Sequence, residues 1–173
     1  MRLILMGLRG AGKSTLGRLV SDRTGSLFVD LDDRTARHLG AGSVAEAWHA
    51  HGEAAFRRAE VECLRRAMEE EVAILALGGG TPTAPGAEAL LLARGPGCKI
   101  VYLRAAAEVL SARIRGGKGR PSLTGGDPAE EVGEVLERRD PLYLAMADEV
   151  IDIGVVDEEG AAVRLAALHA DGV

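Results

Sequence analysis

The sequence feature that most constrains this chain is a glycine-rich segment close to its start, residues 7–14, which read GLRGAGKS. It follows a short apolar run, residues 3–6, and precedes residues 15–20, whose apolar members recur at helical spacing. A strand, a turn with the spacing G-x-x-x-x-G-K-S/T and a helix, in that order, predict a phosphate-binding loop. In such a loop, backbone N–H groups and the positive end of the helix dipole face an anion. The chain is therefore expected to bind a nucleoside triphosphate.

Composition narrows the class of protein further. The chain has 173 residues, of which 47% are hydrophobic and 27% charged, as is typical of a globular domain in water. A net charge of −5 gives no electrostatic support for a nucleic-acid partner. The phosphate-binding loop begins too early to leave room for a signal peptide, and no apolar run approaches the ~18 residues of a membrane span. We therefore expect a cytoplasmic location, with Cys63 and Cys98 as buried free thiols.

Five short apolar segments predict strands. They are residues 3–6, 27–29, 72–77, 99–103 and 149–153. The segment 72–77 is continuously apolar, which is typical of a parallel strand buried on both faces. Because these strands alternate with helical segments, the sequence predicts a three-layer α/β/α fold with a parallel sheet and right-handed crossovers. No repeat or linker divides the chain, so we expect one domain over residues 1–173.

Start and stop signals place the helices. Thr24-Gly25 ends the first helix, and the capping-box pattern at residues 43–46 opens another, which Gly52 interrupts. The longer helix after Gly52 has an apolar face that consists of Phe56, Cys63, Leu64, Ala67 and Met68. Further helices are expected at residues 85–93, 106–115, from 127 to about Arg139, and after Asp157. The glycine-rich residues 116–127 are too many for an ordinary connection, which favours a functional lid or a disordered loop.

Polar residues follow two of the predicted strands, where ligands of a parallel sheet gather. Asp32 could accept a proton from an attacking hydroxyl or orient that hydroxyl, and Asp30 could hold a Mg²⁺-bound water. The alternative is that these aspartates only cap the next helix, a role we assign to Asp33. The glycines at 78–80 could bring backbone N–H groups close to a small polar ligand, or simply form a tight turn.

Several cations could serve the same site. Lys13 would neutralise the β- and γ-phosphates, and the Ser14 hydroxyl would ligate Mg²⁺. Arg120 could swing over the phosphates, while Arg113 could stack on an adenine face. Arg57 and a second arginine, Arg139, belong to separate helices. Each alone would be a surface residue, but together they would clamp a carboxylate in bidentate fashion, and sequence spacing does not prove that they meet.

In combination, these motifs resemble the shikimate kinase family, which has a P-loop fold of the nucleoside-monophosphate-kinase type. The resemblance covers about residues 2–155. It rests on residues 7–14 (GLRGAGKS), 30–32 (DLD), 52–58 (GEAAFRR), 78–80 (GGG), 120–121 (RP) and 139–143 (RDPLY). It implies a five-stranded parallel sheet in the order 2-3-1-4-5, acceptor-binding helices at about 31–62 and a mobile lid at about 113–127.

The resemblance also implies an activity, the transfer of the γ-phosphoryl group of ATP to the 3-hydroxyl of shikimate with Mg²⁺ as cofactor, by a monomer. The residues expected to contact the nucleotide are Gly10, Ala11, Gly12, Lys13, Ser14, Thr15, Arg113 and Arg120. Those expected to contact the acceptor are Asp32, Arg57, Gly78, Gly79, Gly80 and Arg139. Catalytic roles are expected for Lys13, Asp32 and Arg120, and a place near the metal for Ser14, Asp30 and Asp32.

Three departures from the family pattern and three rival functions are left open, and the first departure is residues 40–42 (GAG), which are one residue longer than usual. Ser122 stands where the family usually has a leucine, and Trp48 stands where it often has a phenylalanine beside the acceptor. A sugar-acid kinase of the same fold, such as a gluconate-type kinase, is the nearest rival. The other two are a nonenzymatic nucleotide-binding module and a nucleotide-gated switch. A module without turnover would be expected to lack Lys13, Asp32 or an arginine, and all are present.

Overall fold

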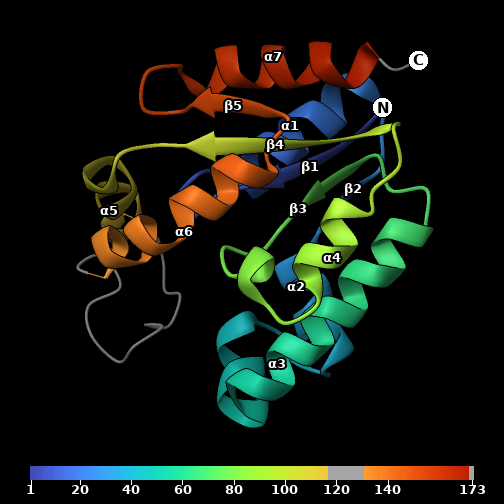
Figure 1. The fold of residues 1–173 in the computed structure, drawn as a ribbon, viewed down its shortest axis with the longest axis vertical. Coiled ribbons are helices and arrows are strands. Elements are labelled where there is room, and N and C mark those ends of the chain that lie inside the picture. Colours follow the sequence, from blue (N-terminus) through green and yellow to red (C-terminus); the bar gives the residue numbers. More distant parts are fainter. Residues whose placement is uncertain (117–130, 172–173) are drawn as a thin grey trace.

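The computed structural model describes residues 1–116 and 131–171 and has the predicted α/β architecture (Figure 1). Within these ranges the sheet has five parallel strands in the order β2-β3-β1-β4-β5, so the predicted strand order is confirmed. The strands are β1 (Arg2–Met6), β2 (Phe28–Asp30), β3 (Ile74–Ala76), β4 (Cys98–Arg104) and β5 (Glu149–Asp152).

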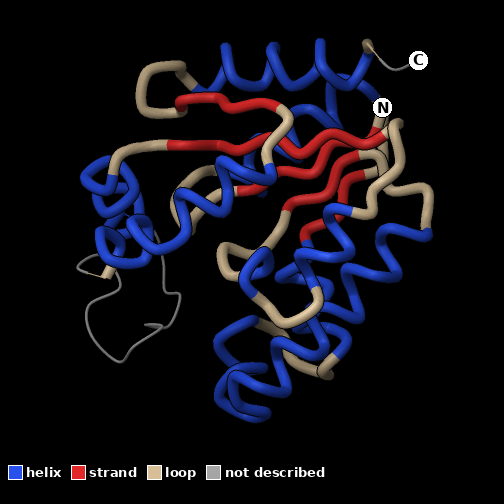
Figure 2. The backbone as a smooth tube through the Cα atoms, viewed as in Figure 1, coloured by secondary structure: helices blue, strands red, loops and turns tan. Residues whose placement is uncertain are grey.

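Helices flank this sheet, as Figure 2 shows in blue around the red strands. They are α1 (Lys13–Thr24), α2 (Leu31–His38), α3 (Val44–Glu69), α4 (Ala87–Leu92), α5 (Ala107–Gly116), α6 (Val132–Met146) and α7 (Glu158–Ala170), with a 3₁₀ turn η1 (Thr81–Thr83). Over the described part of the chain, none of the helices has the length and apolar character that crossing a bilayer needs. The N-terminus lies beside the end of α7, where the Met1 amino group donates to the His169 carbonyl at 3.0 Å.

Strand β1 forms the centre of the core, paired with β3 on one side and β4 on the other. Its apolar residues from Leu3 to Met6 are fully buried. Parallel strands all end at the same edge, so the segments that follow β1, β2 and β3 lie together beyond the carboxyl ends of the strands. The fold thereby gathers the phosphate-binding loop, the aspartates and the glycine triplet along one edge.

Most helix boundaries follow the local signals. Helix α1 ends at Gly25, whose φ of 67° is the left-handed conformation that stops a helix. Helix α3 begins after Ser43, whose hydroxyl accepts the backbone N–H of Glu46 at 3.1 Å. The predicted interruption at Gly52 is confirmed, because its φ of 75° and ψ of 166° are not helical. Neither cysteine forms a disulfide, but Cys98 is only half-buried, whereas Cys63 is fully buried as predicted.

Two predictions about helix ends are wrong. Asp30, not Asp33, caps α2, and its carboxylate accepts the backbone N–H of Asp32 at 3.0 Å and of Asp33 at 3.4 Å. The reason is that β2 runs into α2 without a loop, which leaves Asp30 as the last extended residue. Helix α6 continues past Arg139 and through Pro141 to Met146. The sequence rule that proline stops a helix fails here because Tyr143, beyond the proline, is anchored in the core.

Candidate active site

The phosphate-binding loop curls between β1 and α1. Gly10 and Gly12 have φ values of 81° and 77°, a conformation that residues with a Cβ rarely adopt, which explains the glycines at these two positions. Lys13 begins α1, is buried, and folds back so that its Nζ donates to the carbonyls of Gly7 and Leu8 at 2.8 and 3.0 Å. The ammonium group therefore lies over the loop whose N–H groups would hold phosphate.

Ser14, at the start of α1, contacts Asp30, at the end of β2. The Ser14 hydroxyl donates to Oδ2 of Asp30, while Oδ1 of the same carboxylate caps α2. This arrangement fixes a hydroxyl and a carboxylate oxygen next to the phosphate-binding loop. Both are hard oxygen donors of the kind Mg²⁺ prefers, so this pair fits a hydrated magnesium ion carried by a nucleotide.

A cavity of about 440 Å³ lies beside the same loop. It is lined by Gly10, Ala11, Gly12, Thr15, Leu16, Arg113, Ile153, Val156, Asp157, Glu158 and Ala161. Arg113 reaches across from α5, and its Nη2 donates to the carbonyl of Ile153 at 2.9 Å. The structure thus brings most of the residues predicted to contact the nucleotide to one cavity. Arg120, Ser122 and most of the predicted lid, residues 117–127, lie outside the described residues.

The three glycines after β3 are explained by close approach of neighbouring groups and not by backbone conformation. Gly78, Gly79 and Gly80 do not have positive φ angles. A Cβ on Gly78 would collide with Oδ1 of Asp32, and a Cβ on Gly80 would collide with the guanidinium group of Arg57, 2.8 Å from its Cζ. The triplet therefore packs directly against two of the predicted acceptor-binding residues.

Gly79 connects this turn to the phosphate-binding loop. A Cβ at Gly79 would lie 3.0 Å from the backbone nitrogen of Arg9, which is inside that loop. On its other side, the carbonyl of Gly79 accepts a hydrogen bond from Nη1 of Arg139 at 2.8 Å. The glycine turn thus lies between the predicted phosphate site and the predicted carboxylate clamp.

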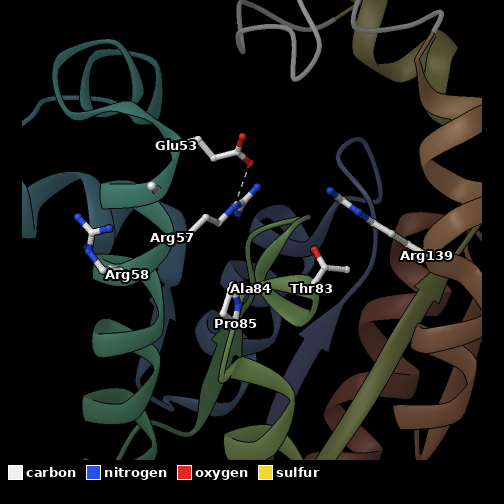
Figure 3. A pocket seen from close by; sticks show the side chains of 8 residues that line it. Glu53, Arg57, Arg58, Thr83, Ala84, Pro85 and Arg139 are labelled. Carbon is white, nitrogen blue, oxygen red and sulfur yellow. Dashed lines mark ion pairs between the residues drawn. The ribbon is translucent and has the colours of Figure 1, made fainter.

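The two predicted clamp arginines face one another across a second cavity, of about 370 Å³. Figure 3 shows Arg57 on α3 and Arg139 on α6 pointing toward each other from opposite sides, with Thr83 of η1 below them. The lining residues are Glu53, Ala54, Arg57, Arg58, Thr83, Ala84, Pro85 and Arg139. Arg58 is drawn pointing away from Arg139, so the pair that converges is Arg57 and Arg139.

Glu60 is the residue of this site that the sequence analysis missed. It is fully buried, accepts a hydrogen bond from Nη1 of Arg57 at 2.8 Å and another from the hydroxyl of Thr81 at 2.6 Å. Burial raises the pKa of Glu60, and the nearby charge of Asp32 raises it further, while Arg57 and Thr81 act in the opposite direction. A signal was available, because Glu60 occupies a position of the apolar stripe, one turn after Phe56.

Arg57 is held on several sides. Besides Glu60, it pairs with Glu53 at 3.7 Å, and its Cζ lies 5.1 Å from the ring centroid of Trp48, a cation–π contact. Trp48 in turn packs on Phe56, with the ring centroids 5.3 Å apart. Trp48 therefore contacts the guanidinium group of Arg57 and is not among the residues that line the cavity.

The arrangement offers a consistent chemistry. Two guanidinium groups suit a carboxylate on a small ligand, and the buried carboxylate of Asp32 lies beside the glycine turn that separates them from the phosphate-binding loop. An anionic ligand with a hydroxyl group would therefore be held next to a bound nucleotide. This is the geometry that phosphoryl transfer requires, because the reaction depends on positioning and on cations around the transferred group.

Comparison with known proteins agrees with this chemistry. The family model described as shikimate kinase matches residues 9–167. Among curated relatives, the shikimate kinase of Aromatoleum aromaticum is 38% identical over 154 residues, covering 89% of this chain and 86% of that protein. The shikimate kinase of Mycobacterium leprae is also 38% identical, over 87% of this chain and 73% of that protein.

Solved structures give the same result. The shikimate kinase from Acinetobacter baumannii in complex with shikimate superposes with a TM-score of 0.86 and 30% identity, covering 98% of this chain and 93% of that one. The deoxyadenosine kinase from M. mycoides with bound dATP superposes with a TM-score of 0.61 at 15% identity, covering 97% and 98%. The second likeness is one of fold alone.

Proposed function

The chain belongs to the shikimate kinase family, and we propose that it transfers the γ-phosphoryl group of ATP to the 3-hydroxyl of shikimate, giving shikimate 3-phosphate and ADP. The observation that carries this proposal is the cavity flanked by Arg57 and Arg139. Only the glycine turn at residues 78–80 separates this cavity from the phosphate-binding loop. Two planar guanidinium forks bind a carboxylate with both charge and direction, so they fix the rest of the acceptor.

Asp32 is the proposed partner of the reacting hydroxyl. It is buried and lies against Gly78 at the carboxyl end of β3, and Glu60 adds a second negative charge nearby. Asp32 would therefore either take the proton of the acceptor hydroxyl or orient that hydroxyl toward the γ-phosphorus.

The phosphate side of the proposal rests on the loop at residues 7–14. Its backbone N–H groups and Lys13 would hold the phosphates, with Gly10, Ala11, Gly12 and Thr15 lining the nucleotide cavity. Arg113 would stack on the adenine, and Arg120 would stabilise charge on the transferred group. Bound Mg²⁺ would neutralise charge on the β- and γ-phosphates, held by Ser14 with Asp30 and Asp32 nearby.

A coupled assay tests the proposal. Purified protein with ATP and MgCl₂ should produce ADP when shikimate is added, and shikimate 3-phosphate should be identified by mass spectrometry. Gluconate, a hydroxy acid that a sugar-acid kinase would phosphorylate, should give no ADP above background. Turnover with gluconate and none with shikimate would refute the assignment of the acceptor. We also propose that the protein is cytoplasmic and monomeric. Light scattering after gel filtration measures its mass in solution and so tests the oligomeric state.

A further inference from the structure

The carbonyl of Gly79 is held by two side chains of the same helix. It accepts a hydrogen bond from Nη1 of Arg139 at 2.8 Å and from the hydroxyl of Tyr143 at 2.5 Å. Arg139 and Tyr143 are four residues apart on α6, so they lie on one face of the helix. One carbonyl oxygen therefore receives both donors.

The direction of this carbonyl sets the direction of the next N–H group. A trans peptide is planar, and its C=O and N–H point to opposite sides, so fixing the Gly79 carbonyl toward α6 fixes the Gly80 N–H away from α6. Glycine leaves the flanking backbone torsions unusually free, and neither Gly79 nor Gly80 has a side chain that could restrain them. Thr81 and Thr83 donate to the flanking carbonyls of Gly78 and Gly80, and the peptide between Gly79 and Gly80 is itself held through its carbonyl.

Of the two donors, Tyr143 is the more firmly placed. It is fully buried, and its ring meets that of Tyr102 edge to face, with centroids 5.3 Å apart. Tyr102 donates to Asp140 at 2.7 Å, and Arg104 grips the same carboxylate at 2.8 and 2.9 Å. These contacts tie the middle of α6 to β4, so the Tyr143 hydroxyl is delivered to the glycine turn by a rigid frame.

Arg139 has a second task in the proposed function, because its guanidinium group is also needed by the acceptor's carboxylate. A guanidinium group that turns toward an acceptor gives up part of its hold on the Gly79 carbonyl. Tyr143 lies behind the turn and has no such second task. Burial raises the pKa of Tyr143, so its hydroxyl remains a donor throughout the neutral range.

We propose that Tyr143 is a positioning residue: its hydroxyl, through the Gly79 carbonyl, keeps the Gly80 N–H directed so that this backbone group can donate to the acceptor. The inference rests on the proposed acceptor site. It adds that α6 supplies both a cation for the acceptor and the contact that orients the glycine turn. The expected signature is a loss of acceptor affinity with little change in the affinity for ATP.

The test compares two single-atom deletions, Tyr143→Phe and Tyr102→Phe. Each removes one hydroxyl from the same edge-to-face pair of rings, but only the Tyr143 hydroxyl contacts Gly79. In Tyr143→Phe the KM for shikimate should rise about tenfold, the effect of one lost hydrogen bond that directs a polar contact, while the KM for ATP stays within about twofold. In Tyr102→Phe, Arg104 still holds Asp140 by two hydrogen bonds and so keeps α6 tied to β4, and both KM values should stay close to those of the wild type.

A second measurement needs no substrate. The ¹⁵N relaxation of the Gly80 amide in the free protein should give a lower order parameter in Tyr143→Phe than in the wild type or in Tyr102→Phe. An unchanged Gly80 order parameter in Tyr143→Phe would overturn the inference, as would equal KM changes in both variants or a fall in kcat alone. Absence of activity in the wild type would refute the proposed function, whereas the relaxation result decides the role of Tyr143 independently.

Discussion

Replacing Glu60 by glutamine isolates what a buried charge contributes to the acceptor site. The substitution keeps the size and shape of the side chain but removes the negative charge that faces Nη1 of Arg57 at 2.8 Å. The side chain of Glu60 is 1% exposed and that of Arg57 is 15% exposed, so solvent screens this ion pair weakly. Arg57 in the variant should sample orientations that do not suit a bound carboxylate.

The size of the effect follows from the loss of charge, because glutamine still offers Arg57 an acceptor oxygen but a neutral one. Hydrogen bonds to charged groups are worth about 1.5–3 kcal/mol, which corresponds to roughly 10- to 150-fold in affinity. Because Glu53 and Trp48 still contact Arg57 in the variant, we expect the lower part of that range, about 10- to 50-fold. The KM for shikimate should rise by this factor, and the KM for ATP should change by less than about twofold.

The chain supplies a matched control for this experiment. Glu53 also pairs with Arg57, at 3.7 Å, but its side chain is 63% exposed. Exposed pairs contribute little, so Glu53→Gln should change the KM for shikimate by about twofold or less. Initial rates at saturating Mg·ATP with varied shikimate, and the reverse, give both constants for each variant. Glu53→Gln with an effect equal to that of Glu60→Gln, or Glu60→Gln with none, would refute the argument from burial.

The pH dependence gives an independent check on Glu60. Its pKa is raised by burial, so it takes up a proton at a higher pH than an ordinary glutamate, and the grip on Arg57 weakens as the pH falls through that raised value. The sign for stability is the opposite. The folded state binds this proton more tightly than the unfolded state, so the contribution of Glu60 to stability is greatest at low pH and declines as the pH rises through the raised pKa. In Glu60→Gln, both pH dependences should be lost.

Three further substitutions test other parts of the site. Asp32→Asn should lower kcat by about 10²-fold or more if the carboxylate accepts the proton, and near-normal turnover would rule out that role. Gly80→Ala should raise the KM for shikimate because the new Cβ displaces the guanidinium group of Arg57, while Gly95→Ala, which meets nothing within 4 Å, should have no effect. Ser14→Ala should raise the Mg²⁺ concentration needed for half-maximal rate by about tenfold or more. Ser21→Ala, which removes a hydroxyl that donates to the Ser26 carbonyl beyond the end of α1, should not. An unchanged Mg²⁺ requirement in Ser14→Ala would contradict its role beside the metal.

Features written in short stretches of sequence were predictable. The phosphate-binding loop, the end of α1 at Gly25 and the start of α7 after Asp157 each depend on residues within a few positions of one another. The alternation of strands and helices along the sequence likewise predicted that the sheet is parallel. Local signals failed where packing against another element decided the outcome. Pro141 predicts the end of a helix, but α6 continues through it because Tyr143, two residues later, is buried in the core.

The acceptor half of the site shows the same limit at the level of single residues. Sequence motifs identified Arg57 and Arg139 as candidates, but spacing alone left open whether they meet. Glu60 was overlooked because an (i,i+3) pair with Arg57 is equally compatible with an exposed helix surface, and only Thr81, 21 positions away, and the fold around it show that Glu60 is buried. Its partners, Arg57 and Thr81, are supplied by its own helix and by a turn that follows a different strand.

The sequence by itself determined that a phosphate-binding loop opens an α/β domain, because the glycine spacing and the periodicity of apolar residues are local properties of the chain. Only the tertiary structure decided that the side chains of Asp32 and Arg57 pack against the glycine triplet. It also decided that the Tyr143 hydroxyl donates to the carbonyl of Gly79, 64 positions away. The physical reason is that such contacts depend on how the crossovers bring helices onto the edge of the sheet. That geometry is set by the whole core and by no single segment.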